Sequence, residues 1–88
     1  MKVHAPDIEQ RALAILRQVA DTDEVLRDPD LPLYTSGLLD SLATVTLIAT
    51  LSEELNVLVS PAEFDPSAWA TPRRFVADVC ARSSSATT

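Results

Sequence analysis

Gly37-Leu38-Leu39-Asp40-Ser41-Leu42 contains the only glycine of the chain, a leucine doublet that requires burial, and an Asp-Ser pair that opens the longest apolar segment. This pattern predicts Asp40 at the N-cap of a helix and Ser41 as its first residue. Backbone N–H groups in a first helical turn lack intrahelical acceptors, and the helix dipole favours an anion there. Ser41 is therefore a position suited to carry a phosphate.

The helix that begins at Ser41 is predicted to run to about Leu55. Asn56 tolerates a positive φ and is expected to end it. The apolar residues recur at spacings of three, three, three and four, which we interpret as a stripe facing the core: Leu42, Val45, Ile48, Leu51 and Leu55.

A first helix is predicted from Pro6 to about Ala20, because apolar residues recur there every three or four positions. The segment 21–32 carries five acidic residues and two prolines, so we expect a long loop with one short turn near 24–27. Three apolar side chains at its end and just beyond it should return to the core: Leu31, Leu33 and Tyr34. His4 is expected to be solvated.

Beyond Asn56, the run 57–59 is apolar and is expected to be extended. Ser60-Pro61-Ala62-Glu63 has the form of a capping box, which predicts a short third helix over 61–65, ended by Pro66. Trp69 is expected to fill the core. The Thr71-Pro72 pair predicts a fourth helix from Pro72 to Arg82.

These segments predict an all-α domain, a small four-helix bundle with one short third helix and a long loop between helices one and two. Residues 1–82 form the expected domain, and residues 83–88, which contain only serine, alanine and threonine, are expected to be a disordered tail. Arg73 and Arg74, in the first turn of the fourth helix, are expected to be solvated, with a contact to a partner protein as the alternative.

The 88 residues carry a formal net charge of -6, which disfavours nucleic acid and anionic membranes and favours basic proteins as partners. The single cysteine, Cys80, cannot form an internal disulfide. Neither a leader nor an apolar run of about 20 residues is evident. We therefore expect a soluble, cytoplasmic, monomeric protein.

The chemistry of an autonomous enzyme is not evident in this sequence. A nucleophilic Ser41 would need a base, but His4 is the only histidine and no glycine stands two residues from the serine on either side. The Cys/His spacing of a metal site and the glycines of a phosphate-binding loop are both missing. Ser41 is therefore interpreted as the substrate of another enzyme, and no catalytic or metal-ligating residue is assigned.

The segment 36–42, followed by Val45, resembles the signature of the acyl and peptidyl carrier proteins. The resemblance implies that Ser41 carries 4'-phosphopantetheine derived from coenzyme A, with a carboxylic acid held as a thioester on its thiol. It also implies that Asp40 supports the modification. The surface read by partner enzymes would lie on the same helix, for which we assign Leu42, Ala43, Thr46 and Leu47.

Within this family, the pattern is most similar to the D-alanyl carrier branch. The residues that carry the similarity are Gly37 to Ser41, Thr44-Val45, Glu63-Phe64-Asp65, Trp69 and Thr71-Pro72. The implied partners of a freestanding carrier are a phosphopantetheinyl transferase, an ATP-dependent adenylating ligase and a downstream acyl acceptor enzyme. Two alternatives stay open: a carrier of a natural-product pathway, and an unmodified helical interaction module.

Overall fold

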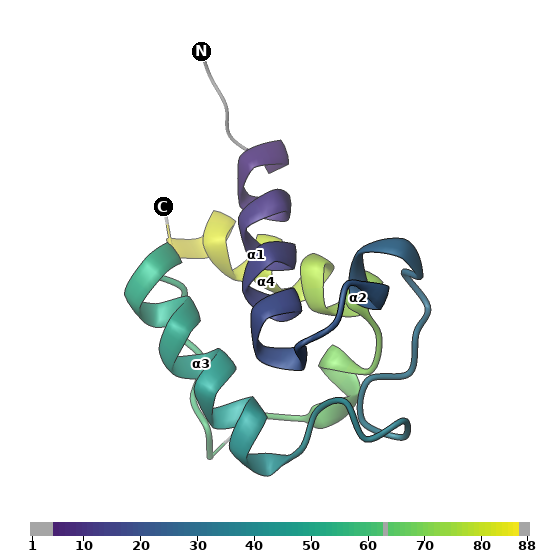
Figure 1. Ribbon diagram of the computed structural model, residues 1–88. Helices are drawn as coiled ribbons and strands as arrows, with labels where there is room; N and C mark the ends of the chain where they lie inside the picture. Colours follow the sequence, from purple (N-terminus) through teal and green to yellow (C-terminus); the bar gives the residue numbers. More distant parts are fainter. Residues whose placement is uncertain (1–4, 63, 87–88) are drawn as a thin grey trace.

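The computed structural model describes residues 5–62 and 64–86 of the chain (Figure 1). His4 and Glu63 lie outside these residues, together with the predictions made for them. The helices are α1 (Ala5–Ala20), α2 (Glu24–Arg27), α3 (Ser41–Leu55), the 3-10 helix η1 (Pro66–Trp69) and α4 (Pro72–Ala86). The described residues include no strand, which confirms the predicted all-α class.

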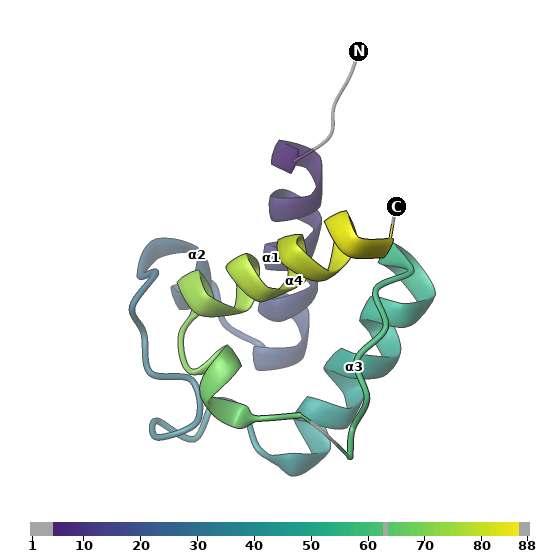
Figure 2. The ribbon, with the colours of Figure 1, turned by 180° about the vertical axis from the view of Figure 1, so that it is seen from behind.

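Helix α1 lies at the centre of the bundle and packs against both α3 and α4. Figure 1 shows α3 to one side of α1, and the reverse view in Figure 2 shows α4 crossing in front of α1, on the face turned away in Figure 1. The side chains between these helices are fully buried and include Leu16, Leu47 and Val79. The core expected from the first and fourth helical segments is therefore present.

Trp69 is fully buried and fills part of the core, as the sequence predicts. Its ring centroid lies 4.5 Å from that of Phe64 and 5.0 Å from that of Phe75. The indole N–H donates a 2.8 Å hydrogen bond to the carboxylate of Asp78, which also accepts from Arg82. The polar edge of the buried indole is thus satisfied.

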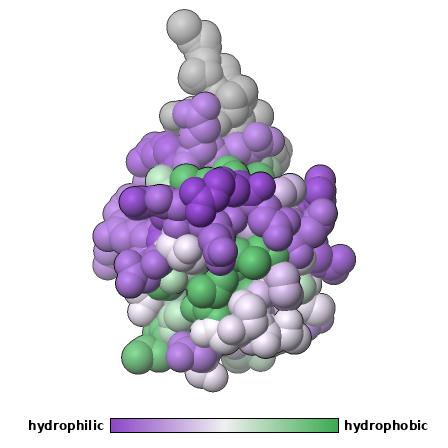
Figure 3. Space-filling view, turned by 45° about the vertical axis from the view of Figure 1, so that its right-hand side comes forward, coloured by the Kyte–Doolittle hydropathy of each residue, from purple (hydrophilic) through white to green (hydrophobic). Residues whose placement is uncertain are grey.

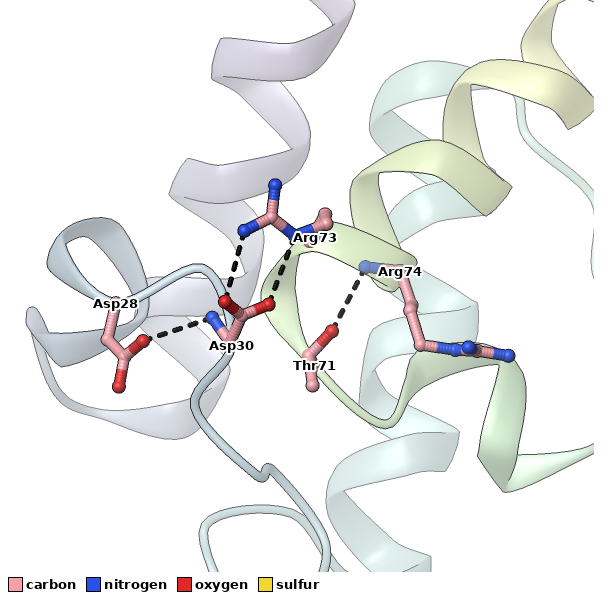
Figure 4. A network of polar contacts seen from close by, with 5 residues as sticks. All are labelled: Asp28, Asp30, Thr71, Arg73 and Arg74. Carbon is pink, nitrogen blue, oxygen red and sulfur yellow. Dashed lines mark hydrogen bonds and ion pairs between the residues drawn. The ribbon is translucent and has the colours of Figure 1, made fainter.

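The long loop between α1 and α3 is anchored on the start of α4 (Figure 4). The guanidinium of Arg73 donates two hydrogen bonds to the Asp30 carboxylate, at 3.0 and 3.1 Å, and its backbone N–H donates to the Pro29 carbonyl at 2.9 Å. Leu33 N–H donates to the Ala70 carbonyl at 2.8 Å. The loop therefore has a defined path towards Ser41.

Both arginines at the start of α4 are exposed, yet each has a partner within the chain. Arg73 pairs with Asp30, and Arg74 donates from Nε to the Ser67 carbonyl at 3.0 Å. Both side chains are exposed to solvent, as expected, and the sequence did not indicate these additional partners within the chain.

The short third helix lies later in the chain than predicted. Pro61 and Ala62 form a turn, and η1 begins at Pro66, the residue expected to end the helix. Asp65 caps η1, because its carboxylate accepts a 3.0 Å hydrogen bond from Ser67 N–H. Ser60-Pro61 and Asp65-Pro66 both have the cap-then-proline pattern, and the helix begins at the second pair instead of the first.

Helix α4 continues through Ala86, four residues past the predicted end at Arg82. Neither glycine nor proline follows Arg82, so no strong helix-ending residue interrupts the segment. Residues 83–86, assigned to a disordered tail, are thus helical, while residues 87–88 lie outside the described part of the chain.

Candidate functional site

Helix α3 begins with a side-chain cap immediately before Ser41. Asp40 has extended backbone angles, and its carboxylate accepts a 2.8 Å hydrogen bond from Ala43 N–H. At the other end, Asn56 has a φ of 58° and closes the helix, as predicted. Ser41 is therefore fixed as the first residue of α3, and its side chain is exposed to solvent.

The loop that leads into this cap is held by short backbone hydrogen bonds. Leu39 N–H donates to the Leu33 carbonyl at 2.9 Å, and Gly37 N–H donates to the Tyr34 carbonyl at 3.1 Å. Leu33 and Leu39 are both buried, which fixes the segment on the core. Gly37 has a φ of 87°, a conformation that favours glycine. The glycine and one leucine of the doublet therefore shape the turn that presents Ser41.

Tyr34 and Thr44 form a polar contact beneath this turn that the sequence analysis did not identify. The hydroxyl of Thr44, a residue with only 9% of its surface exposed, lies 2.6 Å from the Tyr34 hydroxyl and 2.8 Å from the Asp40 carbonyl. Burial raises the pKa of the Tyr34 phenol. No signal in the sequence separates Thr44 from Thr46 and Thr50 of the same helix.

The buried face of α3 differs from the predicted stripe. Leu42 and Val45 are 75% and 57% exposed, whereas the buried residues of the helix are Thr44, Leu47 and Leu51. A helix advances about 100° per residue, so nine residues rotate a side chain by about half a turn. Leu42 and Leu51 therefore lie on opposite faces and cannot share one stripe.

The predicted partner surface needs a corresponding correction. Leu42 and Thr46 are exposed and Ala43 is half-buried, so these three side chains reach the surface near Ser41. Leu47 is fully buried and cannot contact a partner, so its assignment is wrong. Val45, which the sequence analysis placed in the core, is exposed instead. On the face of the molecule drawn in Figure 3, where the right-hand side of Figure 1 comes forward, an apolar area lies between hydrophilic regions.

A groove with a volume of about 400 Å³ lies beside Ser41. Its wall includes Tyr34, Val45, Ile48 and Phe64 together with Ser41 itself. No hydrogen bond joins the Ser41 hydroxyl to another residue in the described part of the chain. An exposed hydroxyl at a helix start, beside an open groove, fits the attachment of a phosphate-linked chain.

The described residues were also searched for a metal site, a reactive thiol and a membrane-spanning helix. No group of three or more His, Cys, Asp or Glu side chains in 5–62 and 64–86 is placed to hold a metal ion. Cys80 is half-buried, and burial and the nearby Glu9 raise the pKa of its thiol. Across the same ranges, no helix has the length and apolar character needed to cross a membrane.

Comparison with known proteins gives one family and a group of similar relatives. The family described as "Phosphopantetheine attachment site" matches residues 10–79. The D-alanyl carrier protein of Listeria monocytogenes is 40% identical over 67 residues, which cover 76% of this chain and 86% of the relative. The D-alanyl carrier protein of Enterococcus faecalis is 38% identical over 73 residues, or 83% and 94% of the two chains.

The match includes all of α3, the cap at Asp40 and the exposed Ser41. Members of this family are carriers of phosphopantetheine and are not themselves catalytic. This chain therefore belongs to the phosphopantetheine attachment site family of carrier proteins.

Proposed function

We propose that Ser41 is the residue that receives 4'-phosphopantetheine, and that the protein is a carrier of the D-alanyl type. The observation that carries the proposal is the exposed Ser41 hydroxyl at the first position of α3, directly after the capping Asp40. The similar D-alanyl carrier proteins support the choice of branch. The arm, once attached, supplies a thiol that can hold a carboxylic acid as a thioester.

Ser41 would act as the nucleophile within the active site of a phosphopantetheinyl transferase. Its hydroxyl oxygen forms a bond to the phosphorus next to pantetheine in coenzyme A, and the P–O bond within the pyrophosphate breaks. Adenosine 3',5'-bisphosphate leaves, and the serine proton passes to a base of the transferase or to water. The first-turn N–H groups of α3 then lie beside the new phosphodiester and favour its negative charge.

Asp40 supports this modification through the conformation of the helix start. Its carboxylate accepts a hydrogen bond from Ala43 N–H, and its backbone carbonyl accepts one from Thr44 N–H at 2.9 Å. Both the side chain and the backbone of the residue before Ser41 are therefore fixed. Replacing a capping Asp by Ala costs about 1 kcal/mol of stability in proteins. The cap therefore reduces the freedom of the hydroxyl that must be aligned for attack.

The partners proposed for this carrier are a transferase, an ATP-dependent adenylating ligase that loads D-alanine, and a downstream acyl acceptor enzyme. The side chains nearest Ser41 offer them an apolar surface with a hydroxyl group, formed by the exposed Leu42, Val45 and Thr46 and the half-buried Ala43. The net charge of -6 favours basic surfaces on these partners. We place the protein in the cytoplasm, where ATP and coenzyme A are available.

The attachment site is tested by incubating the protein with coenzyme A and a broad-specificity transferase, followed by intact mass measurement. The wild-type protein should gain one phosphopantetheine, and Ser41→Ala should gain none. Ser60→Ala, a change at another exposed serine, is the matched control and should be modified like the wild type. Modification of Ser41→Ala, or an unmodified wild-type protein, contradicts the proposal.

The cargo is tested separately with the modified protein. An adenylating ligase for D-alanine and ATP should add one alanyl mass to the arm, whereas the L-isomer should be added more slowly. Preferential loading of a different acid by a ligase from the same organism would favour the natural-product alternative and leave the Ser41 assignment intact.

A further inference from the structure

We propose that Tyr34 and Thr44 are positioning residues for the modification of Ser41, acting through a chain of two hydrogen bonds that ends on the peptide between Asp40 and Ser41. The inference rests on the proposed function, because it concerns how the Ser41 hydroxyl is presented to the transferase. Neither side chain needs to touch the reacting atoms for this role.

The direction of the hydrogen bonds follows from the number of hydrogens available. Thr44 has one hydroxyl hydrogen, and the geometry gives it to the Asp40 carbonyl at 2.8 Å. The Thr44 oxygen is then the acceptor in its 2.6 Å contact with Tyr34, and the phenol is the donor. The two hydrogen bonds therefore run in series from the Tyr34 hydroxyl through the Thr44 hydroxyl to the Asp40 carbonyl.

The end of this chain lies next to the proposed attachment residue. The Asp40 carbonyl accepts from both the hydroxyl and the backbone N–H of Thr44, at 2.8 and 2.9 Å. The carbon of this carbonyl is bonded directly to the nitrogen of Ser41. Rotation of the Asp40–Ser41 peptide would break both hydrogen bonds, so the chain restricts the direction in which the Ser41 side chain leaves the helix.

The Tyr34 end of this pair of hydrogen bonds is fixed to the loop. The Tyr34 carbonyl accepts a hydrogen bond from Gly37 N–H, and the N–H of the preceding residue, Leu33, donates to the Ala70 carbonyl. Tyr34 thus ties the start of α3 to a loop that is itself anchored near α4. This connection gives the phenol a role that a phenylalanine of the same shape could not have.

Two other threonines of α3 show what is particular to Thr44. Thr46 and Thr50 also donate their hydroxyls to the carbonyl four residues earlier, at 3.1 and 2.8 Å. In the described part of the chain, neither receives a hydrogen bond from a loop residue. Thr50 makes the same local bond nine residues beyond Ser41 and is therefore a matched control.

The variants that test the proposal keep side-chain shape and remove hydroxyls. Thr44→Val removes the central hydroxyl, Tyr34→Phe removes the donor, and Thr44→Ser keeps the hydroxyl. Each variant is mixed with coenzyme A and the transferase, and kcat and KM are obtained from initial rates of the mass increase. Thermal unfolding of each variant is measured in parallel.

Thr44→Val should lower kcat by about tenfold, because small misplacement of a reacting group is costly, while KM changes by less than about twofold. The surface formed by Leu42 and Val45 is untouched, which is why KM should hold. Tyr34→Phe should lower kcat in the same direction but less, Thr44→Ser should restore the wild-type value, and Thr50→Val should leave it unchanged. The double variant Tyr34→Phe/Thr44→Val should be no slower than Thr44→Val alone, since both changes interrupt the same series of hydrogen bonds.

Wild-type kcat in both Thr44→Val and Tyr34→Phe would overturn the inference. It would also be overturned if the loss appeared in KM alone, or equally in Thr50→Val, because those results indicate docking or general helix stability. If Thr44→Val does not fold, Tyr34→Phe decides, since it removes a single hydroxyl from a half-buried side chain and keeps the ring in place. An unmodified wild-type protein refutes the proposed function itself, a result distinct from all of these.

Discussion

Tyr34 links the stability of the folded protein to alkaline pH. Burial raises the pKa of its phenol above the ordinary value of about 10. The folded protein therefore holds this proton more tightly than the unfolded chain does. The resulting stability is fully present below about pH 10 and is lost as the pH rises through the pKa of the folded state.

Because Tyr34 is the only tyrosine, phenolate absorbance reports this titration directly. The folded protein should titrate at a higher pH than the same protein in denaturant. The Cys80 thiol also has a raised pKa and contributes to alkaline instability, so Tyr34→Phe should remove only part of the decline. A phenol that titrates identically in both states would contradict the prediction.

Gly37 gives a second prediction at the scale of one residue. A Cβ at this position would meet no atom within 4 Å, so the space is open, but the φ of 87° disfavours any other residue. Gly37→Ala should therefore cost about 1 kcal/mol in the free energy of unfolding. Asn56→Gly is the control and should be nearly neutral, because glycine readily adopts its φ of 58°. Equal stability of Gly37→Ala and the wild type in urea would show that the turn can adjust.

Helix α3 shows how far the sequence determines an element and where the sequence-based prediction fails. Its ends were predictable, because Asp40 and Asn56 are local signals that act on the adjacent backbone. Its rotation about the axis was not, because apolar residues occur on every side of the helix. Only the packing of α1 and the loop against α3 selects Leu47 and Leu51 for the core, and this long-range information is absent from the spacing.

The orientation of α3 about its axis is tested by replacing two leucines with alanine in separate variants. Leu47→Ala should destabilise the protein by about 2–5 kcal/mol, because it opens a cavity in a buried position. Leu42→Ala should change stability little, since its side chain is 75% exposed, and should instead raise KM for the transferase. Urea unfolding measures the first effect and modification kinetics the second. If Leu42→Ala destabilised the protein and Leu47→Ala raised KM instead, Leu42 would face the core, as the apolar spacing predicts.

The candidate site was predictable for a different reason from the fold. Ser41 and Asp40 are adjacent in the chain, so their pattern could be recognised without knowing the packing. The contact of Tyr34 with Thr44 joins two elements through a loop that closes only in the folded protein. A hydroxyl pair of this kind carries no mark in the sequence that separates it from ordinary surface threonines.

At the scale of the whole molecule, the loop and α4 are joined by an exposed ion pair. The hydrogen bond from Arg73 lowers the pKa of Asp30, so the pair persists as the pH falls below the ordinary carboxylate value. The ion pair contributes to the stability of the folded protein above the pKa that Asp30 has in the unfolded chain. This stability is lost as the pH falls through the lower pKa that Asp30 has in the folded protein. Because both side chains are exposed, salt should weaken the pair.

Asp30→Asn should therefore loosen the loop without unfolding the bundle. Amide hydrogen exchange at Leu31 and Leu33 should become a few-fold faster, whereas exchange in the middle of α1 should not change. Glu53→Gln, an exposed change on α3, is the control and should leave the loop protected. Unchanged exchange in Asp30→Asn would mean that the backbone bonds of Pro29 and Leu33 suffice to hold the loop.

The aromatic contact in the core gives this carrier an intrinsic optical reporter. Trp69 is the only tryptophan, and its ring lies against Phe64, which also lines the groove beside Ser41. A group that enters the groove and shifts Phe64 alters the surroundings of the indole. Tryptophan emission can then follow arrival and departure of the cargo in real time, with no dye attached to the surface proposed for partner enzymes.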